Sequence, residues 1–431
     1  MRTDRIRKAI LSLLTASCLF HAHAAWSAEG VGPTPEGMSP GLPLIRDELG
    51  TATLKLFTYV RYINQQRLDE TYTDSFGQTS FLDRRQDIHL NKMNIQFLGW
   101  VRDPKLRYLA YVWTSGTSQG QTSQVVVGGN LNYTFSPRVT LGGGIGALPG
   151  VRSTEGNFPF WLSTDNRLIA DEFFRPSYTM GIWATGAIND RLQYQAMLGN
   201  NLSQFGVDAS QIDDGLNTVS LALNWFPTTG DYGPRGAFGD FQAQPKPATR
   251  VAAHYTHSLE TSQGQPTTDA FENVQIRISD GNVIFEPSLF GPGIQIRNAT
   301  YQMLSLDGGV KHRGYALEGE FYWRRIDEFG GPGVAGLPFS ALEDDGFQLQ
   351  ASGMVRPRSL QLYVSLSKVF GEYGDPWDSR LGLNWYPWKD LVVWWNFEYL
   401  YTDRSPVGAA SLPYIVGGNG TTLYTSFIIN F

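Results

Sequence analysis

Hydrophobic and polar residues alternate along most of this chain, in segments of roughly ten residues that are separated by turns or by longer polar stretches. In residues 360–367, leucine and valine occupy every second position and polar side chains occupy most of the others. Because side chains alternate between the two faces of a strand, this period of two predicts β-structure. Counting such segments from Leu54 to Phe431 gives about sixteen strands. In residues 84–99 the phase shifts, which predicts a β-bulge near Asn91 and Lys92.

The last stretch, residues 423–431, shows the pattern most clearly and ends on an aromatic residue. Leucine, threonine, phenylalanine and isoleucine share one face, and the other face is mostly small and polar, as expected of a strand between lipid and a watery lumen. The ending resembles the closing strand of bacterial outer-membrane proteins. That resemblance implies that Phe427, Ile429 and Phe431 form an assembly signal that the barrel-assembly machinery recognises. For this segment alone, an edge strand of a soluble sandwich is the alternative.

The short joints between strands share one chemistry, since proline, asparagine, aspartate and glycine set turn dihedral angles. These joints are residues 102–105, 135–138, 188–191, 312–314, 356–358 and 387–390. Aromatic residues lie beside them, and a ring of aromatic side chains at one level is typical of a bilayer interface. If the N-terminus is periplasmic, every short joint is periplasmic too. The connection from Pro227 to Thr249 is the one long exception.

The first fifty residues differ from the rest. Residues 1–24 have a basic start, a short apolar core and an Ala-x-Ala site, which predicts a secretory signal peptide. A lipoprotein signal ending at Cys18 is the alternative, but it would leave a very short apolar core. Residues 25–50 are rich in proline and glycine and lack periodicity, which predicts an N-terminal periplasmic segment. The remaining residues, 51–431, are predicted to form a transmembrane β-barrel.

Composition supports a barrel rather than a helical membrane protein. A mean hydropathy of -0.24 and 17% charged residues would suit a soluble protein, and no later stretch is apolar and long enough for a membrane helix. Aromatic residues nevertheless make up 13% of the chain, and in a barrel only alternate residues meet lipid. The formal net charge of -6 argues against nucleic acid as a partner. The single cysteine lies in the predicted signal, so neither thiol chemistry nor disulfides are expected.

Two hairpins carry a family resemblance. Residues 97–114 run through a tight turn at Asp103 and Pro104 into a strand that contains Tyr108, Tyr111 and Trp113. In residues 174–200 a large loop returns to the wall, and a hairpin with a tight turn at Asn189 and Asp190 follows. They resemble the porins of Gram-negative bacteria that are grouped with the phosphate-selective porins O and P, and the similarity of pattern spans most of residues 51–431. The resemblance implies a trimeric outer-membrane channel of sixteen strands, surrounded by lipid, for passive diffusion of small hydrophilic solutes and ions. Phosphate-selective members line their path with a ladder of basic residues. The basic residues here form no single series, so only a modest anion preference is expected.

Alternation also predicts which charges face the lumen. Six basic and four acidic residues fall on the side opposite the apolar face: Lys55, Arg61, Arg107, Asp307, Lys311, Glu318, Glu320, Arg324, Arg380 and Glu398. Opposed charges across a narrow lumen would order water and favour small polar solutes. The alternative for each residue is a charge solvated in a wide lumen or tied to a neighbour on the wall.

The third long loop, residues 148–175, is the predicted constriction. Its candidate residues are Arg152, Glu155, Asp165, Arg167, Asp171, Glu172 and Arg175. The loop also carries an apolar cluster, residues 158–162, which would need a surface to pack on, and the inside of the barrel is the nearest. If the loop enters the lumen, its three arginines would stand at the narrowest point, although its own acids could neutralise them. The alternatives are a loop that folds on itself above the membrane or packs at a trimer contact. Residues 258–299 form a longer loop that could cover the pore.

Enzymatic features are weak, and neither a cofactor nor a metal site is predicted. His254 and His257 have a metal-ligand spacing for a helix, but on a strand they would point to opposite faces. The glycines of residues 142–146 do not complete a dinucleotide-binding motif. No nucleophile–histidine–acid set stands out. The alternatives to a porin are a binding or adhesion barrel and, less favoured, a barrel hydrolase.

Overall fold

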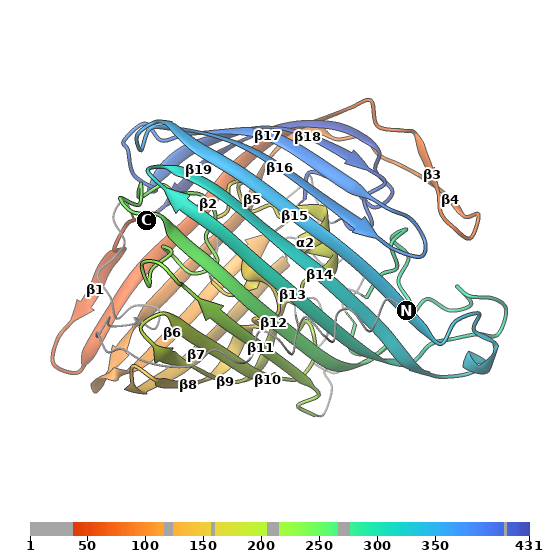
Figure 1. The fold of residues 1–431 in the computed structure, drawn as a ribbon, viewed down its shortest axis with the longest axis horizontal. Coiled ribbons are helices and arrows are strands. Elements are labelled where there is room, and N and C mark those ends of the chain that lie inside the picture. Colours follow the sequence, from red (N-terminus) through yellow and green to blue (C-terminus); the bar gives the residue numbers. More distant parts are fainter. Residues whose placement is uncertain (1–37, 116–123, 157–159, 205–214, 266–275, 409–411) are drawn as a thin grey trace.

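Sixteen antiparallel strands close into one barrel in the computed structural model, which describes residues 38–115, 124–156, 160–204, 215–265, 276–408 and 412–431. The last strand pairs with the first, from Asn430 opposite Phe57 to Thr421 opposite Gln66, and this pairing closes the sheet (Figure 1). The predicted all-β, up-and-down barrel is therefore confirmed. The barrel strands are β2 (Gly50–Gln66), β5 (Gln86–Val101), β6 (Asp103–Ser115), β7 (Gln124–Ser136), β8 (Val139–Ala147), β9 (Tyr178–Asn189), β10 (Leu192–Gly199), β11 (Thr218–Trp225), β12 (Ala248–Thr261), β13 (Asn298–His312), β14 (Tyr315–Gly330), β15 (Ala341–Arg356), β16 (Leu360–Phe370), β17 (Trp377–Trp385), β18 (Val393–Asp403) and β19 (Gly420–Asn430).

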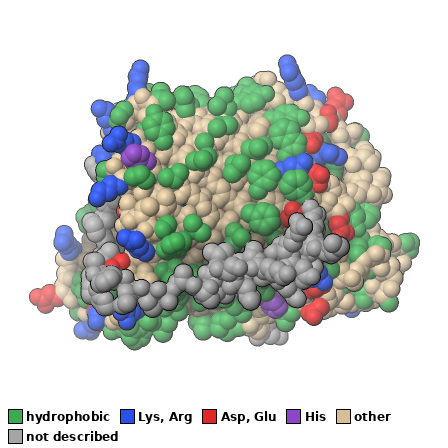
Figure 2. Space-filling model, viewed as in Figure 1, with side chains coloured by type: hydrophobic (Ala, Val, Ile, Leu, Met, Phe, Trp, Pro, Cys, Tyr) green, Lys and Arg blue, Asp and Glu red, His purple; other side chains and the backbone are tan. Residues whose placement is uncertain are grey.

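The two faces of the sheet follow the sequence pattern. In β16, Leu362, Val364 and Leu366 are exposed on the outer face, whereas the residues between them are buried on the inner face. Figure 2 shows hydrophobic and uncharged side chains over the middle of the visible wall and most charged side chains toward its two ends. An apolar surface of this extent is unusual for a protein that faces water on all sides. It suits a barrel whose outer wall faces lipid.

The ends of the barrel differ in the length of their connections. We call the end with the short joints and the C-terminus the turn end, and the other the loop end. At the turn end, one basic residue in each of four joints has a positive φ: Arg102, Arg313, Arg358 and Lys389. The predicted bulge is confirmed, because Tyr59 pairs with Lys92 and Val60 with Leu90, which leaves Asn91 unpaired in the ladder.

Smaller elements flank the barrel. The strand β1 (Leu42–Arg46) pairs with residues 51–54 of β2, so part of the segment predicted to be aperiodic is ordered as a strand. It lies on the edge of β2 that β19 leaves unpaired, since β19 pairs only with residues 57–66 of β2. At the loop end, β3 (Thr71–Thr73) and β4 (Thr79–Phe81) form a hairpin. The helical elements are η1 (Arg152–Thr154), α2 (Ile169–Phe174) and η3 (Val334–Gly336), and no helix of the described residues is long and apolar enough to cross a membrane.

The core of the protein lies inside the barrel. At the loop end, Phe173 and Phe174 of α2 pack with Tyr322 of the wall and with Ile278 and Ile284 of the loop between β12 and β13. The rings of Phe174 and Tyr322 are stacked, with centroids 5.1 Å apart. Residues 276–297 of that loop thus cover one side of the opening. The predicted signal peptide and the residues of the predicted segment before 38 lie outside the described residues.

A second apolar cluster lies inside the turn end. Phe57 and Trp394 of the wall pack there with Phe241 of the long connection and Tyr386 of a turn, and Phe160 of the third loop joins them. The connection between β11 and β12, residues 226–247, therefore enters the lumen instead of staying outside it. Its unusual length in the sequence has this structural reason.

Deleting Phe431 should lower the yield of folded barrel. The backbone N–H of Phe431 donates to the carbonyl of Leu56 and its carbonyl accepts from the same residue, so the deletion removes two bonds at the closing seam. We expect the intact protein to migrate differently in SDS before and after boiling, and the deletion variant to show less of the unboiled form. Equal yields of the unboiled form would exclude a role for Phe431 in assembly.

Candidate functional site

The described residues of the third loop, 148–156 and 160–177, lie inside the barrel, as predicted. Its backbone and side chains bond to strands on several sides of the lumen. The amide of Asn384 donates to the carbonyl of Leu162 at 2.9 Å, and the N–H of Ala170 donates to the hydroxyl of Ser367 at 3.1 Å. The helix α2 contacts β14 through β17, and Figure 1 shows it within the outline of the barrel. The loop is therefore a fixed part of the lumen.

Glu318 of β14 joins this loop to the wall and to the connection. The guanidinium of Arg152 lies 2.6 Å from its carboxylate, and Nζ of Lys311 lies 3.6 Å away. From the connection, the hydroxyl of Tyr232 and the N–H of Gly239 donate to the same carboxylate at 3.1 and 2.7 Å. Loop, connection and wall thus meet at one buried negative charge.

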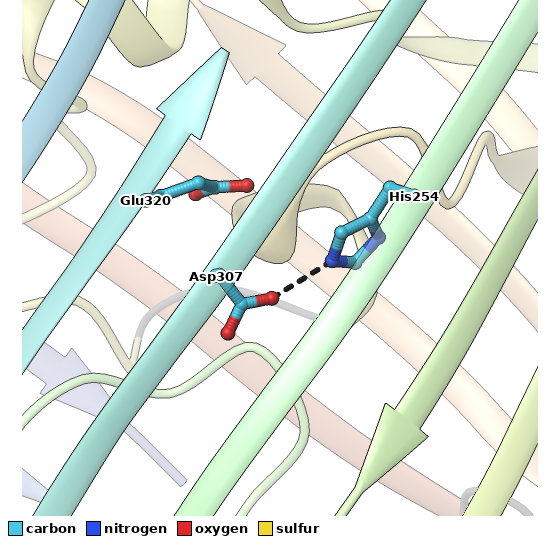
Figure 3. Close-up of side chains that lie close together, drawn as sticks. All are labelled: His254, Asp307 and Glu320. Atoms are coloured by element: carbon cyan, nitrogen blue, oxygen red, sulfur yellow. Dashed lines mark hydrogen bonds and ion pairs between the residues drawn. The ribbon is translucent and has the colours of Figure 1, made fainter. Parts of the chain in front are cut away.

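A second charged cluster includes His254 of β12 and Asp307 of β13, which Figure 3 shows side by side. Arg250 of β12 pairs with Asp307 of β13 at 2.6 Å and with Glu155 of the third loop at 2.9 Å. Nε2 of His254 lies 2.8 Å from Asp307, and Nδ1 donates to the carbonyl of Pro149 at 3.0 Å. These contacts hold the start of the loop against two strands.

His254, Asp307 and Glu320 are close enough to be considered as a metal site, with ligand atoms within 4.8 Å of one another. Their atoms are already engaged by donors, however. Glu320 accepts from Ser305, Tyr322, Gln348 and the backbone of Arg152. Asp307 accepts from Arg250 and His254, and both nitrogens of His254 face oxygen atoms of the protein. The cluster therefore fits a structural network better than a metal site.

The seven loop residues predicted to form the constriction are all buried, at most 9% exposed. Besides Arg152 and Glu155, Asp165 pairs with Lys92 of β5 at 2.7 Å. Arg175 pairs with Glu172 at 2.6 Å, and Arg167 lies 3.5 Å from Glu172 and 4.0 Å from Asp171; the guanidinium of Arg167 also lies over the ring of Trp161. The arginines are thus neutralised by carboxylates of the loop and the wall. The reason is that an unpaired charge in so dry a place would be costly.

The ten residues predicted to line the lumen all belong to the inward-facing set of their strands, but their surroundings differ. Eight are buried beneath the loop and the connection: Arg61, Asp307, Lys311, Glu318, Glu320, Arg324, Arg380 and Glu398. Arg324 pairs with Asp344 at 2.5 Å, and Arg380 pairs with Asp378 at 2.8 Å. Only the remaining two of the ten, Lys55 and Arg107, are half-buried. Most charges predicted to face water therefore serve as partners for buried groups.

Several partners were missed by the sequence analysis. Lys92, Arg250, Asp344 and Asp378 each form a buried ion pair, although none was predicted to face the lumen. Asp344 could have been found from its phase in β15, where inward positions alternate with outward ones. Lys92 could not, because it follows the bulge that shifts the phase of its strand.

The lumen is filled on one side and open on the other. From β11 to β19 nearly all inward side chains are buried, and we call this the filled side. Toward the turn end of β5 to β9 most inward side chains are half-buried, and we call this the open wall. It includes Gln96, Leu98, Trp100, Arg107, Leu109, Asn130, Asn132 and Trp183. Water therefore reaches the lumen off its axis.

Comparison with known proteins shows the fold. No family model and no curated protein matches the sequence. Among solved structures, the in-vitro folded, trimeric form of OmpT, an outer membrane protein of Vibrio cholerae, has a TM-score of 0.52 at 10% identity and covers 89% of this chain and 100% of its own. The anion-selective porin of Comamonas acidovorans has a TM-score of 0.55 at 9% identity, and the match covers 89% of this chain and 100% of the porin. The outer membrane channel DcaP of Acinetobacter baumannii has a TM-score of 0.54 at 7% identity, and the match covers 90% of this chain and 100% of DcaP.

Replacing Glu318 with glutamine should destabilise the barrel strongly. The change leaves Arg152 and Lys311 buried near a neutral amide, and breaking one side of a buried ion pair costs about 3–5 kcal/mol. The exposed pair of Arg325 and Glu343 provides the control, since Glu343→Gln removes the same charge from a pair in water and should cost less than about 1 kcal/mol. Denaturant unfolding of the refolded proteins measures both. Equal losses would show that Glu318 does not anchor the loop.

Asp171 should make stability depend on pH. Burial raises the pKa of Asp171 to about 7, against the opposing effect of Arg167 and with a further rise from Glu320. Burial also opposes ionisation of Glu172, but its pair with Arg175 outweighs this and lowers the pKa of its carboxyl. The folded protein therefore holds a proton on Asp171 that the unfolded chain has released by about pH 4. The contribution of protonated Asp171 to the free energy of unfolding is fully present below about pH 4 and is lost as pH rises toward 7.

The test compares Asp171→Asn with the unchanged protein by denaturant unfolding between pH 4 and 8. We expect the variant to gain relative stability as pH rises, because its amide does not ionise. Asp231→Asn, at an exposed position of the connection, is the control and should show no such trend. A constant difference between Asp171→Asn and the unchanged protein would contradict the assignment.

Proposed function

We propose that this protein is an outer-membrane channel for passive diffusion of small hydrophilic solutes and ions. The observation that carries the proposal is the contrast between an apolar outer wall and an open inner wall in which polar and basic side chains meet water. A barrel of sixteen strands is wide enough to leave an aqueous passage, and the third loop narrows it without filling it. The similar folds of proteins described as a porin and a channel support the proposal.

A modest preference for anions belongs to the same proposal. Lys55 and Arg107 are half-buried on the open side of the lumen, and Arg235 of the connection is half-buried near Gln195 of β10. The acids of the third loop are already paired with basic residues, so they contribute little net charge. Charge counts most where the passage is narrow and screening by mobile ions is weak. A similar fold belongs to a porin described as anion-selective.

The outer surface supports a position of the barrel in a membrane. We place the exposed apolar wall in outer-membrane lipid, with the turn end in the periplasm and the loop end outside. Assembly into a homotrimer is part of the proposal, and it is supported by a similar fold that is described in a trimeric form. The proposal also includes export directed by residues 1–24. It further includes insertion by the barrel-assembly machinery, which would recognise Phe427, Ile429 and Phe431.

The test is conductance and reversal potential in planar bilayers across a salt gradient. We expect stable steps of conductance and a modest excess of anion current. Lys55→Gln should lower that excess, whereas Lys246→Gln, on the exposed part of the connection, should leave it unchanged. Absence of conductance would contradict the channel and favour the binding or adhesion barrel. Marked cation selectivity would contradict the anion preference alone.

A further inference from the structure

One row of residues crosses the open wall at right angles to its strands. Trp100 of β5 pairs with Arg107 of β6, which pairs with Asn132 of β7. Asn132 pairs with Gly142 of β8, and Gly142 pairs with Trp183 of β9. Since directly opposite residues share a face of the sheet, these side chains all face the lumen. All five residues are half-buried. We call them the Trp100–Trp183 row.

Glycine holds the indole of Trp183 flat against the wall. A Cβ atom at Gly142 would lie 2.2 Å from Nε1 of that indole, and one at Gly146 would lie 2.9 Å from its Cζ3. The ring therefore occupies the space above two glycines of β8, which no other residue would leave free. Its Nε1 donates to the amide oxygen of Asn132 at 2.9 Å, which fixes its orientation. The rest of the ring packs partly against the apolar cluster at the loop end, and the half-buried indole presents its remaining surface to the lumen.

Arg107 differs from the arginines of the filled side. Its Nε donates to the carbonyl of Pro104 at 3.2 Å, and no carboxylate of the described residues lies within ion-pair distance of it. By contrast, Arg152, Arg324 and Arg380 are each paired with a carboxylate. A guanidinium that has no carboxylate partner within the protein can bind the carboxylate of a solute by two parallel hydrogen bonds. The row thus offers one cation between two aromatic side chains.

We infer that the Trp100–Trp183 row is a binding subsite for small ring carboxylates that pass through the channel. The flat indole of Trp183 would stack on the apolar ring of such a solute, and Arg107 would hold its carboxylate. The part of the indole that the loop-end cluster leaves uncovered is apolar surface that a bound ring would bury. This inference rests on the proposed function, because it assumes that solutes enter the lumen. A neutral sugar could stack on the indole too, but it would leave the guanidinium unpaired.

Calorimetric titration of the full-length protein in detergent tests the subsite without requiring conductance. The ligands are benzoate, acetate, benzyl alcohol and glucose. We expect benzoate to bind on the order of tenfold more tightly than acetate or benzyl alcohol, because it alone uses both groups. Glucose should bind more weakly than benzoate.

Two substitutions separate the contribution of the Trp183 indole to binding from that of the Arg107 guanidinium. Trp183→Leu should weaken benzoate roughly tenfold and leave acetate unchanged, whereas Arg107→Gln should weaken both acids and leave benzyl alcohol unchanged. Trp395→Leu, at an exposed position of the outer face, is the control for loss of an indole and should change neither acid. Each variant is first shown to fold by its shift on boiling in SDS.

The outcomes separate this inference from the proposed function. Equal affinities for benzoate and acetate, or no effect of Trp183→Leu in a folded barrel, would overturn the subsite while leaving the channel intact. Glucose binding as tight as that of benzoate would replace the ring carboxylate with a sugar. Benzoate binding by a barrel that conducts no ions would retain the subsite and overturn the channel.

Discussion

A barrel of sixteen strands encloses more space than the side chains of its own wall can fill. Water can occupy that space, or parts of the chain can. Here the third loop, the connection and the loop between β12 and β13 occupy one side and leave the other to water. The position of every group in the lumen depends on this division. The filled side acquires an apolar core at each end, and the open wall keeps side chains that a solute can touch.

Between the two apolar cores lies a layer of charge. Glu318, Asp307 and Glu155 would each be costly to bury alone, and each is matched by an arginine, a lysine or a histidine from another segment. The pairing is specific because segments distant in the sequence supply the two signs. The charged layer therefore fixes which way the loop lies, while the aromatic contacts at the ends supply most of the buried apolar area. These two roles explain why so many arginines lie inside the barrel without reaching its open wall.

Much of the architecture could be predicted from the sequence, because it depends on local periodicity. The alternation in residues 360–367 fixed both faces of β16, and the shift of phase near Asn91 revealed the bulge. The fate of Arg152, Arg167 and Arg175 was not predictable in the same way. Whether a charge meets water or a carboxylate depends on the path of a loop, and periodicity does not describe loops. The role of the connection was also missed, although its length was noticed. Its aromatic residues Tyr232, Phe238 and Phe241 indicate that it packs on a surface, but they are spaced apart instead of grouped as in residues 158–162.

If solutes pass through the barrel as proposed, an off-axis passage acts as a slot rather than a tube. In a slot a molecule stays within reach of one wall for most of its transit, so friction against that wall governs its speed. The time for which the wall retains a solute then depends on the whole length of contact instead of on a single narrow ring. A protein of this shape can discriminate between solutes of equal size by how long each lingers, and its throughput would respond to the chemistry of a strip of wall more than to the bore.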